Sequence, residues 1–138
     1  MSRGRQVDDR AELTHFVRVT LGCGCPDEIV AQTVVDQVEG QGCGLDVGGR
    51  LLVRLLPSDD LDTLVDEFPA TVRRLRDERD RRGFQRLRMV VAHREADLVA
   101  DVLSQMLQVL AADDDRVHVH GVAESEIPGA LAERAESS

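Results

Sequence analysis

Two spacings of apolar residues alternate along the second half of this chain. Residues 51–56, 86–92 and 116–122 are short apolar or alternating runs with the length of strands, whereas residues 59–82 and 94–112 repeat apolar positions every three or four residues. Elements in this order most economically make a small parallel sheet, with right-handed crossovers and helices packed against it. The pattern therefore predicts a βαβαβ unit.

The two helices predicted in this unit differ in their apolar surfaces. In the first, one apolar stripe continues through Pro69, so we expect a single helix that is kinked or broken there and ends at Gly83. The second is apolar over a wide arc and is expected to be the most buried helix. Its apolar residues are Leu98, Val99, Val102, Leu103, Met106, Leu107 and Leu110.

Upstream of this unit the pattern is less regular. Asp9 and Glu12 make a start like a capping box, and the apolar residues that follow recur at helical spacing up to Gly22. Residues 9–21 are therefore predicted to form a helix, with a β-branched strand as the alternative. Residues 26–38 open with a proline and two acids, which favours a second short helix over a strand.

Glycines set the structure expected between these segments and the βαβαβ unit. The glycines of residues 40–44 predict a flexible connection, and residues 45–52 predict a hairpin around a primed turn at Gly48 and Gly49. The fold class expected is thus α/β in a single domain. It has an N-terminal helix and a cysteine-containing loop, then the hairpin, then a small, mostly parallel sheet covered by helices.

Polar and charged ends bound the expected domain. Residues 1–8 are predicted to be a disordered N-terminus, residues 9–123 a single α/β domain, and residues 124–138 a flexible acidic tail. No linker or internal repeat divides the chain. The 138 residues, 42% of them hydrophobic, suffice for one packed core, which must be aliphatic because the chain has three Phe and no Tyr or Trp.

Composition excludes several function classes. All 17 basic residues are Arg, so Schiff-base and phosphate-loop chemistries that need a lysine are excluded. The lack of Tyr and Trp excludes an aromatic platform for stacking nucleic-acid bases. The formal charge of -9 argues against DNA or an anionic membrane as a general partner, nucleic acid as a whole is not an expected partner, and no apolar run is long enough to span a membrane. These features predict a cytoplasmic protein, in whose reducing surroundings an odd cysteine count is unproblematic.

Three cysteines supply the candidate metal site. Cys23 and Cys25 lie in one glycine-rich segment and Cys43 in another, a C-x-C…C pattern whose thiolates would suit zinc or an iron–sulfur cluster. A fourth ligand would come from His15, His93 or an acid. Two alternatives remain open: small buried cysteines with a structural role, and redox thiols, since Cys25 directly precedes a predicted helix N-terminus.

The histidines form a second candidate set. His118 and His120 point to one face of the last predicted strand, and His93 lies at the carboxyl end of the middle strand, beside Ser58 and Asp59. Ligands usually bind at carboxyl ends in open α/β sheets, which makes this edge a possible pocket rim. The alternative is that His118 and His120 are the polar face of a half-buried edge strand.

Arginine dominates residues 73–88, which hold eight Arg against three acids. Acids four residues after Arg73, Arg74 and Arg76 predict an exposed helix face whose charges pair within the helix, rather than a nucleic-acid footprint.

The stretch from Phe16 to Ile29, which contains LGCGCPDE, resembles a group of small prokaryotic proteins of uncharacterised function with an LGC-x-CPDE-type segment ahead of a βαβαβ-like body. The resemblance implies the layout of the fold and no activity. The leading hypothesis is thus a metal- or cluster-binding protein that uses the three cysteines. The alternative is a non-catalytic homodimeric interaction module with structural cysteines, paired through a strand edge or, as we favour from the sequence, the helix around Met106 and Leu110. A small enzyme that uses His93 is the weaker alternative.

Overall fold

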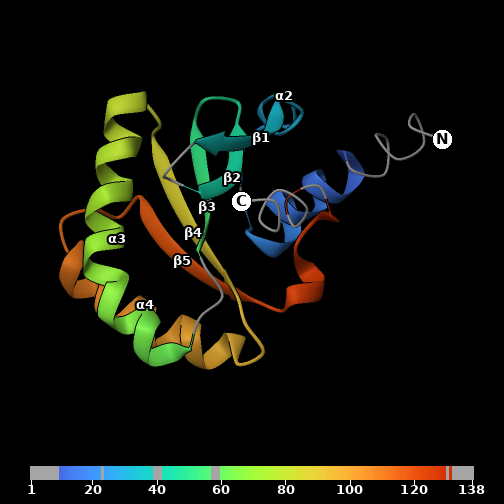
Figure 1. Cartoon of the computed structure of the whole chain (residues 1–138). Helices are drawn as coiled ribbons and strands as arrows, with labels where there is room; N and C mark the ends of the chain where they lie inside the picture. The colour runs from blue at the N-terminus through green and yellow to red at the C-terminus, as the bar shows by residue number, and fades with distance from the viewer. Residues whose placement is uncertain (1–9, 23, 39–41, 57–59, 130, 132–138) are drawn as a thin grey trace.

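The computed structural model describes residues 10–22, 24–38, 42–56, 60–129 and 131. Five strands form one sheet in the order β1-β2-β3-β4-β5 (Figure 1). The strands β1 and β2 are antiparallel, as are β2 and β3, whereas β3, β4 and β5 run parallel. The predicted α/β class is confirmed. The strand bounds are β1 Thr33–Val38, β2 Gly42–Val47, β3 Leu51–Leu56, β4 Arg86–Ala92 and β5 Val117–Val122.

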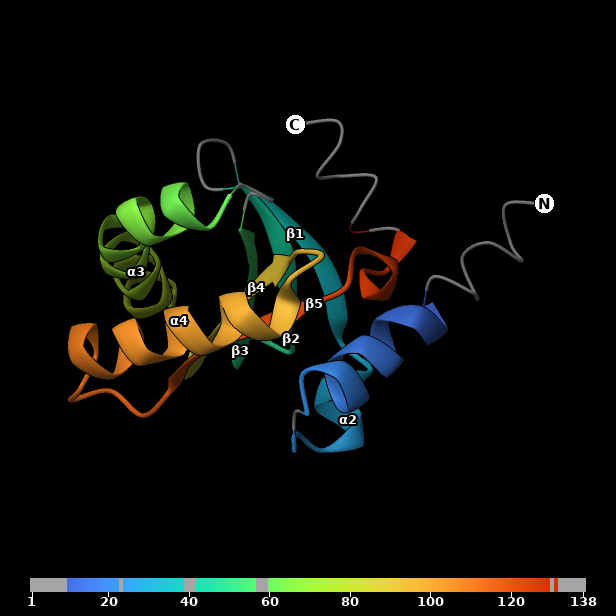
Figure 2. The same cartoon turned by 90° about the horizontal axis from the view of Figure 1, so that it is seen from below.

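Two helices cover one face of the parallel part of the sheet. Helix α3 (Leu61–Arg82) connects β3 to β4, and α4 (Ala96–Leu110) connects β4 to β5. Figure 2 shows both helices on the same side of the strands. Their apolar stripes and the facing strand residues form one core cluster, which includes Leu52, Phe68, Met89 and Leu103. This is the βαβαβ unit that the alternating pattern predicts.

Local signals fix the ends of α3. The Asp60 side chain caps the helix by accepting a hydrogen bond from the Thr63 N–H at 2.9 Å. The helix continues through Pro69 as one element and ends at Gly83, which has a φ of 80°. The predicted start and end are thus correct to within two residues.

The N-terminal helix packs on the opposite face of the sheet. Residues 10–15 are α-helical and Phe16–Thr20 form a π-helical turn, so the predicted helix is confirmed and the strand alternative is wrong. Phe16, Val17 and Leu21 are buried in a second core cluster with Val53 and Val90 of the sheet. The protein therefore has three layers, as Figure 2 shows: two helices, the sheet, and the N-terminal helix.

The second predicted helix is wrong over most of its length. Helix α2 (Asp27–Val30) is a single turn, and the chain then enters β1. The proline and acids do start a helix, but the valines that follow are β-branched and pair with β2 along the strand. Pairing between strands thus overrides a local start signal.

The predicted hairpin is confirmed at the turn between β2 and β3. Gly48 and Gly49 have φ values of 58° and 72°, as a primed turn requires, and the Arg50 N–H donates to Val47 O at 3.1 Å. The flexible connection predicted over residues 40–44 is wrong in its described part, because β2 already begins at Gly42. Residues 39–41 lie outside the described residues.

The packed part of the chain extends beyond the predicted boundary at residue 123. A 3-10 turn (η2, Glu124–Glu126) follows β5, and Leu131 is fully buried in the cluster beneath the N-terminal helix. The Gly129 N–H also donates to Glu12 Oε2 at 2.8 Å. The first part of the predicted flexible tail is therefore part of the fold. The predicted disorder of residues 1–8 falls outside the described residues.

The wide apolar arc of α4 is mostly used within the chain. Met106 and Leu110 pack against the core between α3 and the sheet, whereas Leu98 and Val109 are exposed. This removes most of the surplus surface that the sequence places around Met106 and Leu110. Among the helices of the described residues, none is long and apolar enough to cross a membrane.

Candidate functional site

The structure describes two of the three predicted cysteine ligands, one in a disulfide bond and the other buried in the core. Cys25 is disulfide-bonded and partly buried against the core beneath the N-terminal helix. Cys43 lies on β2 with 3% of its surface exposed, and its sulfur lies 3.9 Å from Leu131 O. Burial raises the pKa of the Cys43 thiol, which favours the protonated form over the thiolate that a metal needs. Cys23 lies outside the described residues.

Within the described part of the chain, no three His, Cys, Asp or Glu side chains are grouped so that they could hold a metal ion. The site that unites Cys23, Cys25 and Cys43 remains a prediction from the sequence. His15, proposed as a further ligand, is exposed on the N-terminal helix in a hollow that it shares with Ser125 and Glu126.

His93 lies where the sequence predicts, just after β4 at the carboxyl edge of the parallel strands. Its Nδ1 accepts a hydrogen bond from the Glu95 N–H at 3.0 Å, which orients the ring. The surrounding hollow is open and carries carboxyl groups from Asp60, Glu95 and Glu124. Ser58 and Asp59, the other predicted members of this rim, lie outside the described residues.

Among the described residues, the topology at this edge differs from that of a typical ligand-binding crevice. Crevices in open α/β sheets arise where neighbouring crossovers leave to opposite faces, whereas α3 and α4 cover the same face here. The start of α4 also packs closely on β5, since a Cβ added to Gly121 would lie 2.1 Å from Ala96 O.

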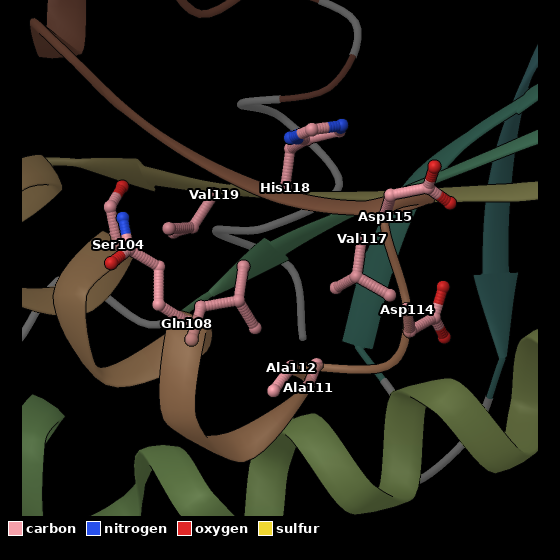
Figure 3. Close-up of a pocket in the computed structure, with 10 residues that line it drawn as sticks. Ser104, Gln108, Ala111, Ala112, Asp114, Asp115, Val117, His118 and Val119 are labelled. Atoms are coloured by element: carbon pink, nitrogen blue, oxygen red, sulfur yellow. The ribbon is translucent and has the colours of Figure 1, made fainter.

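A groove runs between α4 and β5 at one edge of the sheet (Figure 3). Its floor is apolar, from Val117 and Val119, whose side chains point toward α4 while His118 points away. The apolar Leu107 and a set of small or polar residues form the rest of the wall and rim. The small or polar residues are Ser104, Gln108, Ala111, Ala112, Asp114 and Asp115.

Every second residue of β5 directs its backbone N–H and C=O groups to the outer edge of the sheet, beside this groove. The Leu87 N–H donates to Arg116 O and the His93 N–H donates to Val122 O, both at 2.9 Å, so the even-numbered residues of β5 bond to β4. In a parallel pair, the residues between them direct their N–H and C=O groups to the other side. Val117, Val119 and Gly121 therefore present their backbones at the outer edge, where no described strand pairs with them.

The opposite edge of the sheet is protected. The Arg10 guanidinium donates to Ala31 O and Thr33 O, which covers the start of β1. Asp36 places a charge in the middle of the same strand, another feature that discourages pairing. The residues of β5, VHVHGV, include neither proline nor a fixed charge. The structure thus confirms that His118 and His120 lie on an edge strand, and this edge is the less protected of the two.

His120 is partly buried and is already engaged. Its Nε2 lies 2.9 Å from Arg88 Nη1, and since a guanidinium only donates, Nε2 must accept this hydrogen bond. Burial, Arg88 and His118 lower the pKa of His120 to about 4. In this arrangement the neutral ring has no lone pair free for a metal.

Sequence reasoning missed a network of buried charges. Arg54, in the middle of β3, is 1% exposed and pairs with Glu78 of α3, which is also 1% exposed. Arg54 also contacts Asp36 of β1 at 2.9 Å, and Arg82 bridges Asp36 and Glu78. The four charges sum to zero, so the network is satisfied internally and offers no reactive group.

The arginine-rich run pairs across the fold as well as within the helix, where Arg82 contacts Glu78 at 2.7 Å; the prediction includes only pairs within the helix. Arg79 donates to Asp114 at 2.8 Å and Arg76 donates to the same carboxylate at 3.2 Å, which joins α3 to the loop before β5. Arg79 is itself buried.

Three comparisons bear on identity: no family model, no curated protein and no solved structure matched this chain.

Proposed function

We propose that this protein is a non-catalytic interaction module that works as a homodimer, joined through the outer edges of β5 from two copies. The observation that supports it best is the six-residue edge strand whose outward backbone groups pair with no described residue, next to a groove with an apolar floor. An unprotected edge of this kind is a template for pairing with another strand.

A second copy of this chain is the partner that fits this edge best. Antiparallel pairing of β5 with β5 about a two-fold axis at Val119 would place Val117 opposite Gly121 of the second copy. The outward N–H and C=O groups of each β5 strand would then form hydrogen bonds with those of the other. The dimer would be closed, and neither β5 edge would stay exposed. The small side chains of Ser104, Ala111 and Ala112 leave room beside the strand for the second chain.

Structural cysteines fit the same proposal. Cys43 lies in the apolar core between the sheet and the N-terminal helix, where a small thiol packs as a hydrophobic residue. It therefore needs no ligand role to explain its position.

Light scattering over a concentration series tests the dimer. We expect the wild-type protein to have the mass of two chains, and Ala112→Arg, which places a long charged side chain at the groove, to shift it to one chain. Ala70→Arg on the exposed side of α3 is the matched control and should leave the dimer intact.

A wild-type monomer at every concentration would refute the dimer. Dissociation by Val109→Arg, with Ala112→Arg still dimeric, would place the interface on the outer face of α4 instead.

A further inference from the structure

Two neighbouring strands carry basic side chains on the same face of the sheet. Arg86 and Arg88 lie two residues apart on β4, so their side chains leave the sheet on one face. On β5, His118 is the register partner of Arg88, and Arg116 and His120 lie two residues before and after it along the chain. Since register partners in a sheet point to the same face, these five side chains form one surface, which we call the basic face.

The basic face lies on the side of the sheet opposite α3 and α4. In Figure 3, His118 points away from α4. Val90 and Val122 continue the same alternation along β4 and β5, and they pack beneath the N-terminal helix. Arg86, Arg116 and His118 are exposed. A partner can therefore reach these three side chains without any change in the fold.

The charges of the basic face are not neutralised within the described part of the chain. Among the described residues, no ion pair joins an acid to Arg86, Arg88 or Arg116. Burial and the charge of Arg86 lower the pKa of the Arg88 guanidinium. Burial, Arg88 and His118 lower the pKa of His120 to about 4. These groups thus lie close enough to repel one another, which favours a partner that brings negative charge.

We propose that the basic face binds an acidic segment of another protein, in an extended conformation along β4 and β5. A guanidinium matches a carboxylate with two parallel N–H donors, and the chain carries only arginine as its basic residue besides histidine. Alternate side chains of an extended peptide lie about 6.6 Å apart on one face, which is also the spacing of Arg86 and Arg88 along β4. Asp or Glu at every second position of the segment would therefore face the basic side chains.

The exposed and the enclosed members of the basic face contribute differently. Arg86, Arg116 and His118 are exposed and supply the contacts. The Nη1 of Arg88 already donates to Leu21 O and to the His120 ring, so Arg88 adds positive charge to the face rather than a contact. All of these side chains come from one chain. The proposal therefore does not rest on the β5 dimer.

A nucleic acid fits this face less well than an acidic peptide does. Its phosphates would run beyond the two strands onto a protein whose formal charge is -9, whereas the charge of a short peptide ends with the face. The five residues of the basic face also include no Phe, Tyr or Trp on which a base could stack. Charge and composition thus favour the peptide, and nucleic acid becomes an outcome of the test.

The test uses a fluorescently labelled synthetic peptide that alternates Glu and Ser over the length of one strand. Anisotropy at physiological salt measures its affinity, and NMR follows the histidine rings. We expect saturable binding, which should be at least about tenfold weaker for the same peptide with Gln in place of Glu and for an oligouridylate of equal charge. The ring resonances of His118 and His120 should shift, and those of His15 and His93 should not.

Two double variants with the same loss of charge separate the basic face from general attraction. Arg86→Gln combined with Arg116→Gln should weaken binding of the Glu peptide by about tenfold or more. Arg73→Gln combined with Arg81→Gln removes two exposed arginines of α3 instead and should leave the affinity within about twofold. Because all four positions are exposed, both variants should keep the wild-type fold, which circular dichroism checks.

Several results would overturn the proposal. They are the absence of saturable binding, equal affinity for the Gln peptide, and equal losses in the two double variants. Tighter binding of the oligouridylate than of the Glu peptide would also overturn it and make nucleic acid the partner. The histidine shifts locate the bound peptide in the wild-type protein without any substitution, so binding that leaves His118 and His120 unmoved would contradict the proposal as well.

Discussion

Arg54 of β3 and Glu78 of α3 form a fully buried ion pair, with Arg54 Nε 3.2 Å from Glu78 Oε1. The pair links the sheet to the helix that covers it, and Asp36 and Arg82 complete the network from the edge strand and the helix end. Gly44 is the register neighbour of both Asp36 and Arg54 on the strand between them. The Arg54 guanidinium thus reaches across β2 at Gly44, where a Cβ would meet the β3 backbone at Val53 O.

Removing one member of the pair should be strongly destabilising. Glu78→Ala would leave the Arg54 charge buried with one acid that it must share with Arg82, and we expect a loss of about 3 kcal/mol or more in the free energy of unfolding. Urea denaturation followed by circular dichroism measures this. The exposed change Arg81→Ala is the control and should cost less than about 0.5 kcal/mol.

The double variant Arg54→Met with Glu78→Leu tests whether the cost comes from the orphaned charge. It leaves Asp36 and Arg82 as a neutral pair, so it should be less destabilised than the sum of the two single variants. Additive losses would mean that the two side chains act independently, contrary to the contacts described.

The carboxyl groups of this network make the stability of the folded protein sensitive to acid. Burial alone would raise the pKa of Glu78, but hydrogen bonds and charges from Arg54 and Arg82 hold it below the ordinary 4.5. The pKa of Asp36 is likewise held below 3.8, against the effect of burial, by Arg82 and Arg54. A carboxyl group with a lowered pKa in the folded state stabilises the protein above its unfolded pKa, and this stability is lost as pH falls toward the folded pKa.

We therefore expect the unfolding free energy to decrease below about pH 4.5. Glu78→Gln, which cannot ionise, should show a shallower decrease over the same range. An identical slope in the two proteins would show that other carboxyl groups control the acid transition.

The sequence predicts the βαβαβ unit and the glycine hairpin well because their signals are local. The change between strand and helix spacing marks each element from β3 to β5, and two successive glycines specify the turn at Gly48. The strand β1 is different, since proline and acids at residues 26–28 start a helix while the valines after them also suit a strand. Pairing with β2 determines that the valines form a strand. The sequence of a single segment does not show which strand it will pair with.

The charge network had one visible signal, an arginine in the middle of the apolar run LLVRLL. Its partner Glu78 is 24 residues away along the chain, and no spacing rule connects a strand position to a helix position at that distance. Leu131 was similarly hidden, because it is one of only two large apolar residues, with Ile127, in the acidic segment 124–138. The sequence thus leaves open the contacts between elements, including the pairing with β2 that makes residues 33–38 a strand.

Two glycines should tolerate no side chain. A Cβ added to Gly44 would lie 1.7 Å from Val53 O, and one added to Gly121 would lie 2.1 Å from Ala96 O, both against backbone that cannot move cheaply. We expect Gly44→Ala and Gly121→Ala each to lower the unfolding free energy by about 2 kcal/mol or more. Gly24→Ala, which meets nothing within 4 Å, is the matched control. Near-wild-type stability of either strand variant would contradict the close approach described.

The last prediction separates a core thiol from a metal ligand at Cys43. Because its side chain is buried and its thiol pKa is raised, Cys43 should react with Ellman's reagent very slowly in the folded protein and rapidly after unfolding in urea. Cys43→Ala provides the control and should remove one thiol from the count in urea without changing the count in the folded state.

A metal site that used all three cysteines would behave differently. Treatment of protein purified without an affinity tag with a mercurial reagent would then release zinc or iron in a fixed ratio to the chain, and Cys43→Ala would abolish that release. Such a result would overturn the structural role proposed here for Cys43. Slow thiol reaction without metal release is the outcome we expect, since a thiol enclosed by the apolar residues beneath the N-terminal helix has neither the charge nor the access of a ligand.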